Sequence, residues 1–257
     1  MNNRQIVTKA LSSGGVAVLT LDHPARYNAL SKDMIAALTA ALEEVSANKD
    51  VRVIVLKGAG KGFCAGHDLA EISENRDEAF YRALVGSCCG LMQLIQSVPQ
   101  PVIAQVHGAA TAAGCQLVAA CDLAYASDDA RFSTPGVLIG LFCTTPMVAL
   151  SRSIHRKQAL EMLLTGDFIT AARAAAIGLI NASVPVAALD QAVMDSAAKI
   201  AAKPPSIIGM GKKAFYQQAE MATGEAYRFA MDLMVENLLA PVAHDGIATF
   251  LARKKSA

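Results

Sequence analysis

The sequence contains no tryptophan, and aromatic residues make up only 5% of it. Charge is scarce as well: charged residues account for 18%, and the formal net charge is +1, with lysine and arginine scattered along the chain. A nucleic-acid-binding protein concentrates positive charge on one face, so nucleic acid is not an expected partner. Hydrophobic residues, most of them aliphatic, make up 53% of the chain, which excludes a disordered protein. An apolar excess of this size also predicts self-association.

Neither a secretory signal nor a membrane-spanning helix is expected. Residues 1–15 contain no apolar core of the kind that a secretory signal needs. The most apolar window, residues 108–126, is rich in alanine and glycine rather than leucine, and it contains Gln116 and Asp122. We therefore expect a cytoplasmic protein with no membrane partner.

The six cysteines show neither the spacing of a secreted disulfide framework nor that of a zinc site. All of them lie in apolar segments, which predicts buried, reduced thiols and no metal centre. They are Cys64, Cys88, Cys89, Cys115, Cys121 and Cys143.

Hydrophobic periodicity predicts an α/β protein. Strands are expected at residues 5–10, 16–21, 51–57 and 102–106, and helices at 32–47 and 77–97, the first with Ser31 as its N-cap. A Ser-Thr-Pro-Gly turn at residues 133–136 is expected between two β-like segments. From residue 189 onward the pattern is helical. We expect a core of ββα units over residues 1–200 and a helical region over residues 201–257.

Residues 60–65 (GKGFCA) follow a predicted strand and match the dinucleotide pattern G-x-G-x-x-G/A. In a dinucleotide site the third small residue already lies in the helix. Here Gly66 and a helix-capping Asp68 come later, so the helix begins too late for that function. The pattern therefore disfavours NAD binding, and it is not a P-loop because Gly-Lys-Ser/Thr is missing.

Two loops, around Gly66-His67 and around Ala113-Gly114, each lead into a predicted helix with free backbone N–H groups. Two such donors that converge on one oxygen would form an oxyanion hole. The alternative is that both are tight strand-to-helix turns with a purely structural role. The spacing alone leaves both interpretations open.

Six segments appear together in a recognisable order: 63–69 (FCAGHDL), 108–117 (GAATAAGCQL), 121–124 (CDLA), 132–136 (FSTPG), 164–167 (LTGD) and 175–180 (AAIGLI). With them the chain resembles the enoyl-CoA hydratase/isomerase (crotonase) superfamily over nearly its whole length. The resemblance implies a crotonase-like spiral with a C-terminal trimerisation region, and a homotrimer or dimer of trimers. It also implies an acyl-CoA thioester substrate and a role in fatty-acid metabolism. No separate cofactor is implied, because coenzyme A is part of the substrate.

The resemblance also assigns roles to single positions. The backbone N–H groups of His67 and Ala113 match the oxyanion-hole donors for the thioester carbonyl. Arg26 sits where the family places a cation near the CoA phosphates, and Lys212 and Phe215 lie on the C-terminal helix that reaches CoA, often from a neighbouring subunit. The segments that cradle CoA match Ala29, Ala65, Gly66, Asp68 and Leu69.

The departures from the family concern proton transfer. Hydratases have one catalytic glutamate at the position of Gln116 and a second at that of Gly136. An amide can orient water but cannot take its proton at neutral pH, and glycine offers no group at all. Losing both should cost at least the roughly 10²–10⁴-fold attributed to one positioned proton-transfer group. We therefore expect impaired hydration.

Three interpretations remain open: an impaired enoyl-CoA hydratase homologue, a decarboxylase- or isomerase-type enzyme that needs only the oxyanion hole, and a non-catalytic binder of CoA thioesters. Cys143 has no identifiable base beside it, which disfavours a nucleophilic role. The His67 imidazole is expected to be a loop contact. Candidates for a substitute acid or base are Glu74, Glu78 and Tyr81.

Overall fold

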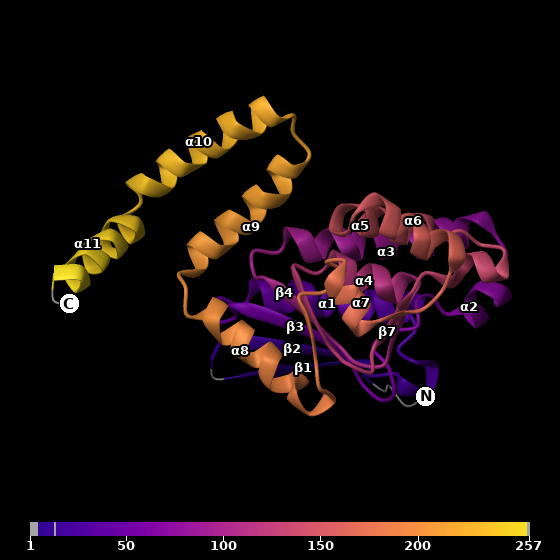
Figure 1. Ribbon diagram of the computed structural model, residues 1–257. Coiled ribbons are helices and arrows are strands. Elements are labelled where there is room, and N and C mark those ends of the chain that lie inside the picture. Colours follow the sequence, from indigo (N-terminus) through magenta and orange to yellow (C-terminus); the bar gives the residue numbers. More distant parts are fainter. Residues whose placement is uncertain (1–4, 13, 256–257) are drawn as a thin grey trace.

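The computed structural model describes residues 5–12 and 14–255, and it is built around a mostly parallel sheet (Figure 1). Within these residues six strands form the main sheet, in the order β1 (Val7–Leu11), β2 (Val16–Leu21), β3 (Val53–Gly58), β4 (Val102–Val106), β6 (Leu123–Ser127) and β9 (Ala182–Val184). Within this six-stranded sheet, only the β1–β2 pair is antiparallel among the described strands. A smaller sheet joins β5 (Ala109–Thr111), β7 (Arg131–Ser133) and β8 (Ile169–Thr170).

Both faces of the main sheet are covered by helices. Alternate residues of β3 divide between two apolar cores: Ile54 and Leu56 belong to the larger, and Val53 and Val55 to the smaller. The larger core contains the buried sides of α1 (Lys32–Ala47), α3 (Glu78–Ser97) and α4 (Ala113–Ala120). The smaller is closed by α8 (Leu189–Ala201). Burial on both faces explains why β3 and β4 read as continuous apolar runs.

Local signals set the ends of the long helices. Ser31 accepts a hydrogen bond from the backbone N–H of Met34 (3.2 Å), which confirms the predicted N-cap of α1. Asp77 does the same for α3 through the N–H of Phe80 (2.9 Å). The remaining helices of the core are α2 (Leu69–Glu74), α5 (Thr144–Ser153), α6 (Arg156–Thr165) and α7 (Ala171–Ala176), with short 3₁₀ turns at η1 (Pro24–Arg26), η2 (Pro135–Ile139) and η3 (Val186–Ala188).

One expectation about the core was wrong. The segment after the Ser-Thr-Pro-Gly turn is the 3₁₀ helix η2, not a β-like strand. Pro135 at its start has a fixed φ suited to a helical turn, and the N–H of Leu141 folds back onto the carbonyl of Gly136 (2.9 Å). The apolar run here therefore forms a helical turn instead of pairing with a sheet.

The chain leaves the core after α8. Helices α9 (Pro205–Ala219), α10 (Thr223–Leu239) and α11 (Pro241–Lys255) extend away from the sheets (Figure 1). Neither α9 nor α10 buries a residue, and they carry large exposed apolar side chains: Phe215, Tyr227, Met231, Met234, Val235, Leu238 and Leu239. The α/β class with a helical C-terminal region is thus confirmed. Among the described helices, none is both long and apolar enough to cross a membrane.

Candidate functional site

The glycine-rich loop after β3 lies directly against the small-residue segment after β4. The N–H groups of Phe63 and Cys64 both donate to the carbonyl of Ala109, at 3.0 and 3.2 Å, and the N–H of Thr111 donates to the carbonyl of Cys64 at 3.0 Å. The Thr111 hydroxyl adds a hydrogen bond to the carbonyl of Ala65 (2.9 Å). The two loops therefore form one hydrogen-bonded unit.

Glycine is required where these two backbones touch. A Cβ on Gly114 would stand 2.1 Å from the carbonyl oxygen of Cys64, and one on Gly108 would stand 2.2 Å from that of Lys61. Gly66 combines the same crowding with a φ of +88°, where L-residues are rare. The small residues of this stretch therefore serve close backbone approach.

The same contact brings together the two predicted oxyanion donors. A Cβ on Gly66, next to His67, would lie 3.1 Å from the backbone nitrogen of Ala113. Ala113 is the first residue of α4, so its N–H has no intrahelical acceptor. Among the described residues, no acceptor is found for the N–H of His67 or of Ala113. Two unpaired backbone donors thus occupy adjacent loops.

Ala112, just before the second donor, has a backbone conformation that alanine rarely adopts. Its φ is 49° and its ψ −119°, a region that costs about 1–3 kcal/mol for a residue with a Cβ. Its N–H donates to the carbonyl of Ser133 (2.9 Å), which fixes the turn. Strain held in place by a hydrogen bond at this point aims the start of α4 at the loop of Gly66.

Asn28 holds the first loop, although the sequence analysis did not single it out. Its side chain is fully buried, and Nδ2 donates to the carbonyls of Ala59, Gly62 and Phe63 at 2.9, 3.0 and 3.1 Å. Its Oδ1 accepts from the N–H of His23 (2.9 Å). A φ of 55° suits asparagine better than most residues. The available signal was its place in the loop between Arg26 and Ala29, to both of which the resemblance assigns a role.

His67 is neutral in this environment. Burial lowers the pKa of its imidazole, and Nδ1 lies 3.2 Å from the carbonyl oxygen of Leu30. A carbonyl can only accept, so Nδ1 carries the proton and Nε2 is left as an acceptor. The N–H of Leu30 in turn donates to the carbonyl of Gly66 (2.7 Å). The imidazole thus ties its loop to the segment before α1, which is a loop contact.

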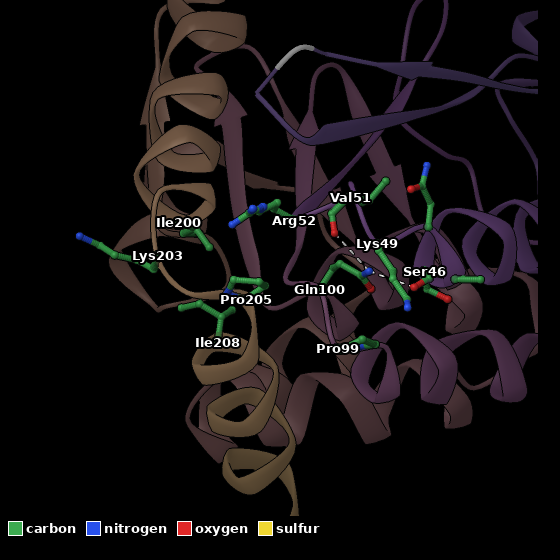
Figure 2. Close-up of a pocket in the computed structure, with 12 residues that line it drawn as sticks. Ser46, Lys49, Val51, Arg52, Pro99, Gln100, Ile200, Lys203, Pro205 and Ile208 are labelled. Carbon is green, nitrogen blue, oxygen red and sulfur yellow. Dashed lines mark hydrogen bonds between the residues drawn. The ribbon is translucent and has the colours of Figure 1, made fainter. Parts of the chain in front are cut away.

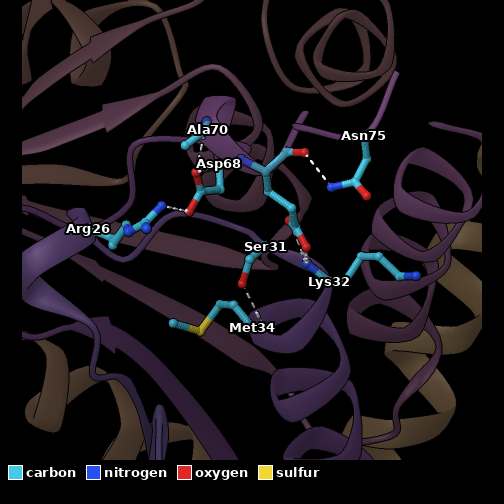
Figure 3. Close-up of polar contacts among 8 residues, drawn as sticks. Arg26, Ser31, Lys32, Met34, Asp68, Ala70 and Asn75 are labelled. Atoms are coloured by element: carbon cyan, nitrogen blue, oxygen red, sulfur yellow. Dashed lines mark hydrogen bonds and ion pairs between the residues drawn. The ribbon is translucent and has the colours of Figure 1, made fainter. Parts of the chain in front are cut away.

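The remaining residues predicted to bind CoA lie in the segment before α1 and in the loop after β3. Asp68 caps α2 by accepting from the N–H groups of Ala70 and Glu71, as predicted, and its other oxygen lies 2.8 Å from Nη1 of Arg26 (Figure 3). The Arg26 side chain remains 52% exposed. Ala29 is buried, whereas Ala65 and Leu69 are exposed beside it. Exposed Ala65 and Leu69 therefore share this part of the surface with the cation of Arg26.

Gln116 and Gly136 sit where the resemblance places catalytic carboxylates. Gln116, in the first turns of α4, is 3% exposed, and its Oε1 has no hydrogen-bond partner in the part of the chain that the structure describes. A Cβ on Gly136 would stand 2.9 Å from the carbonyl oxygen of Leu141 and 3.0 Å from Sγ of Cys143. Position 136 thus has no room for a side chain unless η2 or the segment after it moves.

Lys212 has a different environment from the one predicted. Its Nζ lies 2.6 Å from Oδ2 of Asp122 and donates to the carbonyls of Ile95 and Gln100 at 2.7 and 2.9 Å. Burial lowers its pKa against the opposing effect of Asp122. These three contacts join α9 to the core and engage the ammonium of Lys212. Phe215, on the same helix, is 64% exposed.

Five of the six cysteines are buried and Cys89 is half-buried, with all six thiols free. Burial raises the pKa of Cys64, Cys88 and Cys115 to about 12, and it also raises that of Cys143. These groups are thiols rather than thiolates at neutral pH, which argues further against a nucleophilic Cys143. Among the substitute acids, Glu78 is exposed and paired with Arg82 (2.6 Å).

Comparison with known proteins places these features in a family. The family model for enoyl-CoA hydratase/isomerase matches residues 12–257. Human enoyl-CoA hydratase domain-containing protein 3, mitochondrial, is 41% identical over 248 residues, which span 96% of this chain and 82% of that protein. A putative enoyl-CoA hydratase of Thermus thermophilus is 34% identical over 86% of this chain and 88% of its own length.

Comparison with solved structures indicates the same family. An enoyl-CoA hydratase from Mycobacterium smegmatis superposes with a TM-score of 0.94 at 46% identity, covering 96% of both chains. The structure of human enoyl-CoA hydratase domain-containing protein 3 gives a TM-score of 0.93 at 40% identity, covering 96% of this chain and 98% of that one. The predicted resemblance is thereby confirmed: the chain is similar to enoyl-CoA hydratase domain-containing protein 3, and it belongs to the enoyl-CoA hydratase/isomerase (crotonase) superfamily.

Proposed function

We propose that the chain binds an acyl-CoA thioester, with the thioester oxygen between the backbone N–H groups of His67 and Ala113. The observation that carries this proposal is the adjacency of two backbone N–H groups, on half-buried His67 and buried Ala113, that have no acceptor in the described chain. Each such donor is worth about 3 kcal/mol to a developing oxyanion. The strained turn at Ala112 supports a role beyond packing.

The CoA moiety would lie along the exposed side of the same unit. Ala65 and Leu69 leave space for it, Ala29 and Gly66 shape the backbone beneath, and Arg26 supplies a cation for a phosphate. The Arg26 side chain is half-exposed whereas that of Asp68 is mostly buried, so the ion pair orients the guanidinium and leaves part of it open to a phosphate. Phe215 is a further candidate contact, from this chain or a neighbouring copy.

Hydration would be slow in this site. The unpaired Oε1 of Gln116 can accept a hydrogen bond from a water molecule, yet it cannot remove the proton. Gly136 supplies no second group, and its surroundings exclude one. The protein would therefore be an enoyl-CoA hydratase homologue of fatty-acid metabolism with an impaired acid/base pair.

A second candidate function rests on the lack of carboxylates at positions 116 and 136. An intact oxyanion hole without carboxylates suffices for a decarboxylation or an isomerisation that proceeds through a thioester enolate, because enolate stabilisation is then the main task. Release of CO₂ from malonyl-CoA or methylmalonyl-CoA would identify the decarboxylase. A non-catalytic CoA-thioester binder is the third outcome.

Calorimetric titration with crotonyl-CoA and butyryl-CoA, followed by turnover assays on a thioester panel, separates these possibilities. Saturable binding that is lost in Gly114→Ala and kept in Gly90→Ala is the result expected, since a Cβ on Gly90 meets no atom within 4 Å. If both thioesters fail to bind the unmodified protein, the proposal is wrong. Binding without turnover of any panel member would identify a scaffold.

The assembly and the cellular location stay predictions. The exposed apolar side chains of α9 and α10 support a homotrimer or dimer of trimers, which light scattering would measure directly. Relatives such as the human protein carry the word mitochondrial in their names, which does not fit the cytoplasmic location expected above.

A further inference from the structure

The His67 imidazole has one nitrogen that the fold uses and one that it leaves free. Nδ1 lies 3.2 Å from the carbonyl oxygen of Leu30, and because a carbonyl only accepts, Nδ1 carries the proton of the neutral ring. Nε2 is then an acceptor, and no donor to it is found among the described residues. A purely structural tie between the two segments needs only the first nitrogen.

The free nitrogen is open to solvent. Three polar side-chain atoms of the described chain are buried without a partner: Oε1 of Gln100, Oε1 of Gln116 and Oγ1 of Thr134. Nε2 of His67 is not one of these enclosed atoms, and the residue is only half-buried. Figure 2 shows the contrasting case of Gln100, whose amide nitrogen is tied to the carbonyls of Ser46 and Val51 in the wall of a cavity. The enclosed amide oxygen of Gln100 cannot meet a ligand without a rearrangement, whereas Nε2 of His67 can.

The ring lies on the path proposed above for CoA. The N–H of the same residue is one of the two donors proposed for the thioester oxygen, so a ligand held there starts beside the ring. Leu30, which the ring contacts, follows Ala29 in the segment before α1, and Arg26 of that segment is the cation proposed for a phosphate (Figure 3). The second donor, Ala113, and Gln116 belong to α4 instead. The CoA arm, rather than the acyl chain, would therefore pass the ring.

A thioester of CoA carries an amide N–H close to its carbonyl. One sulfur atom and two methylene groups separate the carbonyl carbon from that nitrogen, so the N–H stays within reach of a side chain beside the carbonyl. Moving an amide N–H out of water is unfavourable unless it finds an acceptor. A neutral imidazole nitrogen with a free lone pair is such an acceptor.

We propose that Nε2 of His67 accepts a hydrogen bond from the amide N–H nearest the thioester sulfur, and so selects thioesters that carry this amide. The inference rests on the binding function proposed above and names a contact of that site. His67 then provides two groups to one ligand, its backbone N–H to the thioester oxygen and its Nε2 to the amide. The bond from Nδ1 to Leu30 holds the ring in place for this contact.

Calorimetry with butyryl-CoA and an analogue of it tests the proposal on the full chain. In the analogue an ester oxygen replaces the amide N–H nearest the sulfur, and every other atom is the same. The unmodified protein should bind the analogue about tenfold more weakly, because one hydrogen bond is lost and the ester oxygen faces a lone pair. Equal affinities for the two would overturn the proposal, and this comparison needs no variant to fold.

His67→Asn separates the free nitrogen from the structural tie. The asparagine amide can replace Nδ1 as the donor to the carbonyl of Leu30, but it has no group in the place of Nε2. Its affinities for butyryl-CoA and the analogue should agree within about twofold. The control His155→Asn, at an exposed residue, should keep the preference of the unmodified protein. A preference that persists undiminished in His67→Asn would overturn the proposal.

The binding of butyryl-CoA itself separates this inference from the function on which it rests. If the unmodified protein binds butyryl-CoA and the analogue equally well, the contact with Nε2 is wrong and the thioester site stands. If it binds neither compound, both proposals are wrong.

Discussion

The carbonyl oxygen of Cys64 occupies the space where a side chain on Gly114 would begin, 2.1 Å from an ideal Cβ. This contact sets the distance between the loop after β3 and the start of α4, and hence between the N–H groups of His67 and Ala113. The atom that a side chain at position 114 would meet is a backbone atom, which cannot rotate away as the end of a flexible side chain can. A larger residue at position 114 must therefore move one of the two loops.

Gly114→Ala is expected to destabilise the protein by about 1–3 kcal/mol, the usual cost of overpacking, and to abolish acyl-CoA binding. Chemical denaturation and calorimetry measure the two effects. The matched control is Gly90→Ala in α3, where the added methyl meets no atom within 4 Å and helix propensity should add about 0.5–1 kcal/mol. Unchanged stability and binding in Gly114→Ala would contradict the described contact.

Asn28 should be indispensable through its amide nitrogen. Asn28→Asp keeps the acceptor for the N–H of His23 and tolerates the positive φ, but it loses the donor to three carbonyls. We expect both Asn28→Asp and Asn28→Ala to lower the free energy of unfolding by about 2 kcal/mol or more. If Asn28→Asp unfolds like the unmodified protein, the three donated bonds do not hold the loop.

Tyr216 gives a pH dependence of stability. Burial, followed by the nearby carboxylate of Asp122, raises the pKa of its hydroxyl far above the ordinary value of 10, and the hydroxyl donates to Oδ1 of Asp122 (2.9 Å). The folded state then keeps a proton that the unfolded state releases above pH 10. The contribution is complete below that pH and falls as the pH rises further.

Denaturation of the unmodified protein and of Tyr216→Phe, at matched pH values on either side of 10, measures this effect. The stability advantage of the unmodified protein should shrink above pH 10, since phenylalanine releases no proton. A difference that stays constant would show that the tyrosine has an ordinary pKa in the fold, and one that grows would show a lowered pKa; either result contradicts the prediction.

Alkylation tests the state of the cysteines. Burial and raised pKa values should protect Cys64, Cys88, Cys115, Cys121 and Cys143 from iodoacetamide at pH 8, leaving half-buried Cys89 as the reactive site. Intact-mass spectrometry should show one adduct on the native protein and six after denaturation. Rapid modification of Cys143 in the native state would reopen its nucleophilic role.

The sequence predicted those parts of the fold that depend on interactions between residues close together in the chain. Ser31 caps α1 through a residue three positions later, and the apolar spacing of α1 and α3 matches their buried sides. Such signals need only neighbouring residues or one helical turn, which a single sequence contains.

What the sequence missed depends on contacts between distant segments. Asn28 reaches carbonyls more than thirty residues away, and Lys212 meets Asp122 from another helix. The resemblance places Lys212 on a helix that reaches CoA, and the contacts of its ammonium with Asp122 and two backbone carbonyls could not be read from the sequence. The lack of room at Gly136 depends on how Leu141 folds back, which no spacing reveals.

The central claim is that an intact thioester cradle lacks its proton-transfer groups, and Gln116→Glu tests it most directly. Gly136→Glu is unsuitable, because its side chain would collide with the backbone at Leu141. The assay follows the loss of crotonyl-CoA absorbance in the unmodified protein, in Gln116→Glu and in the matched control Gln116→Met. We expect hydration by the unmodified protein and by Gln116→Met near the background rate, and an increase of about 10²-fold or more in Gln116→Glu. Hydration by the unmodified protein as fast as, or faster than, that by Gln116→Glu would contradict the claim.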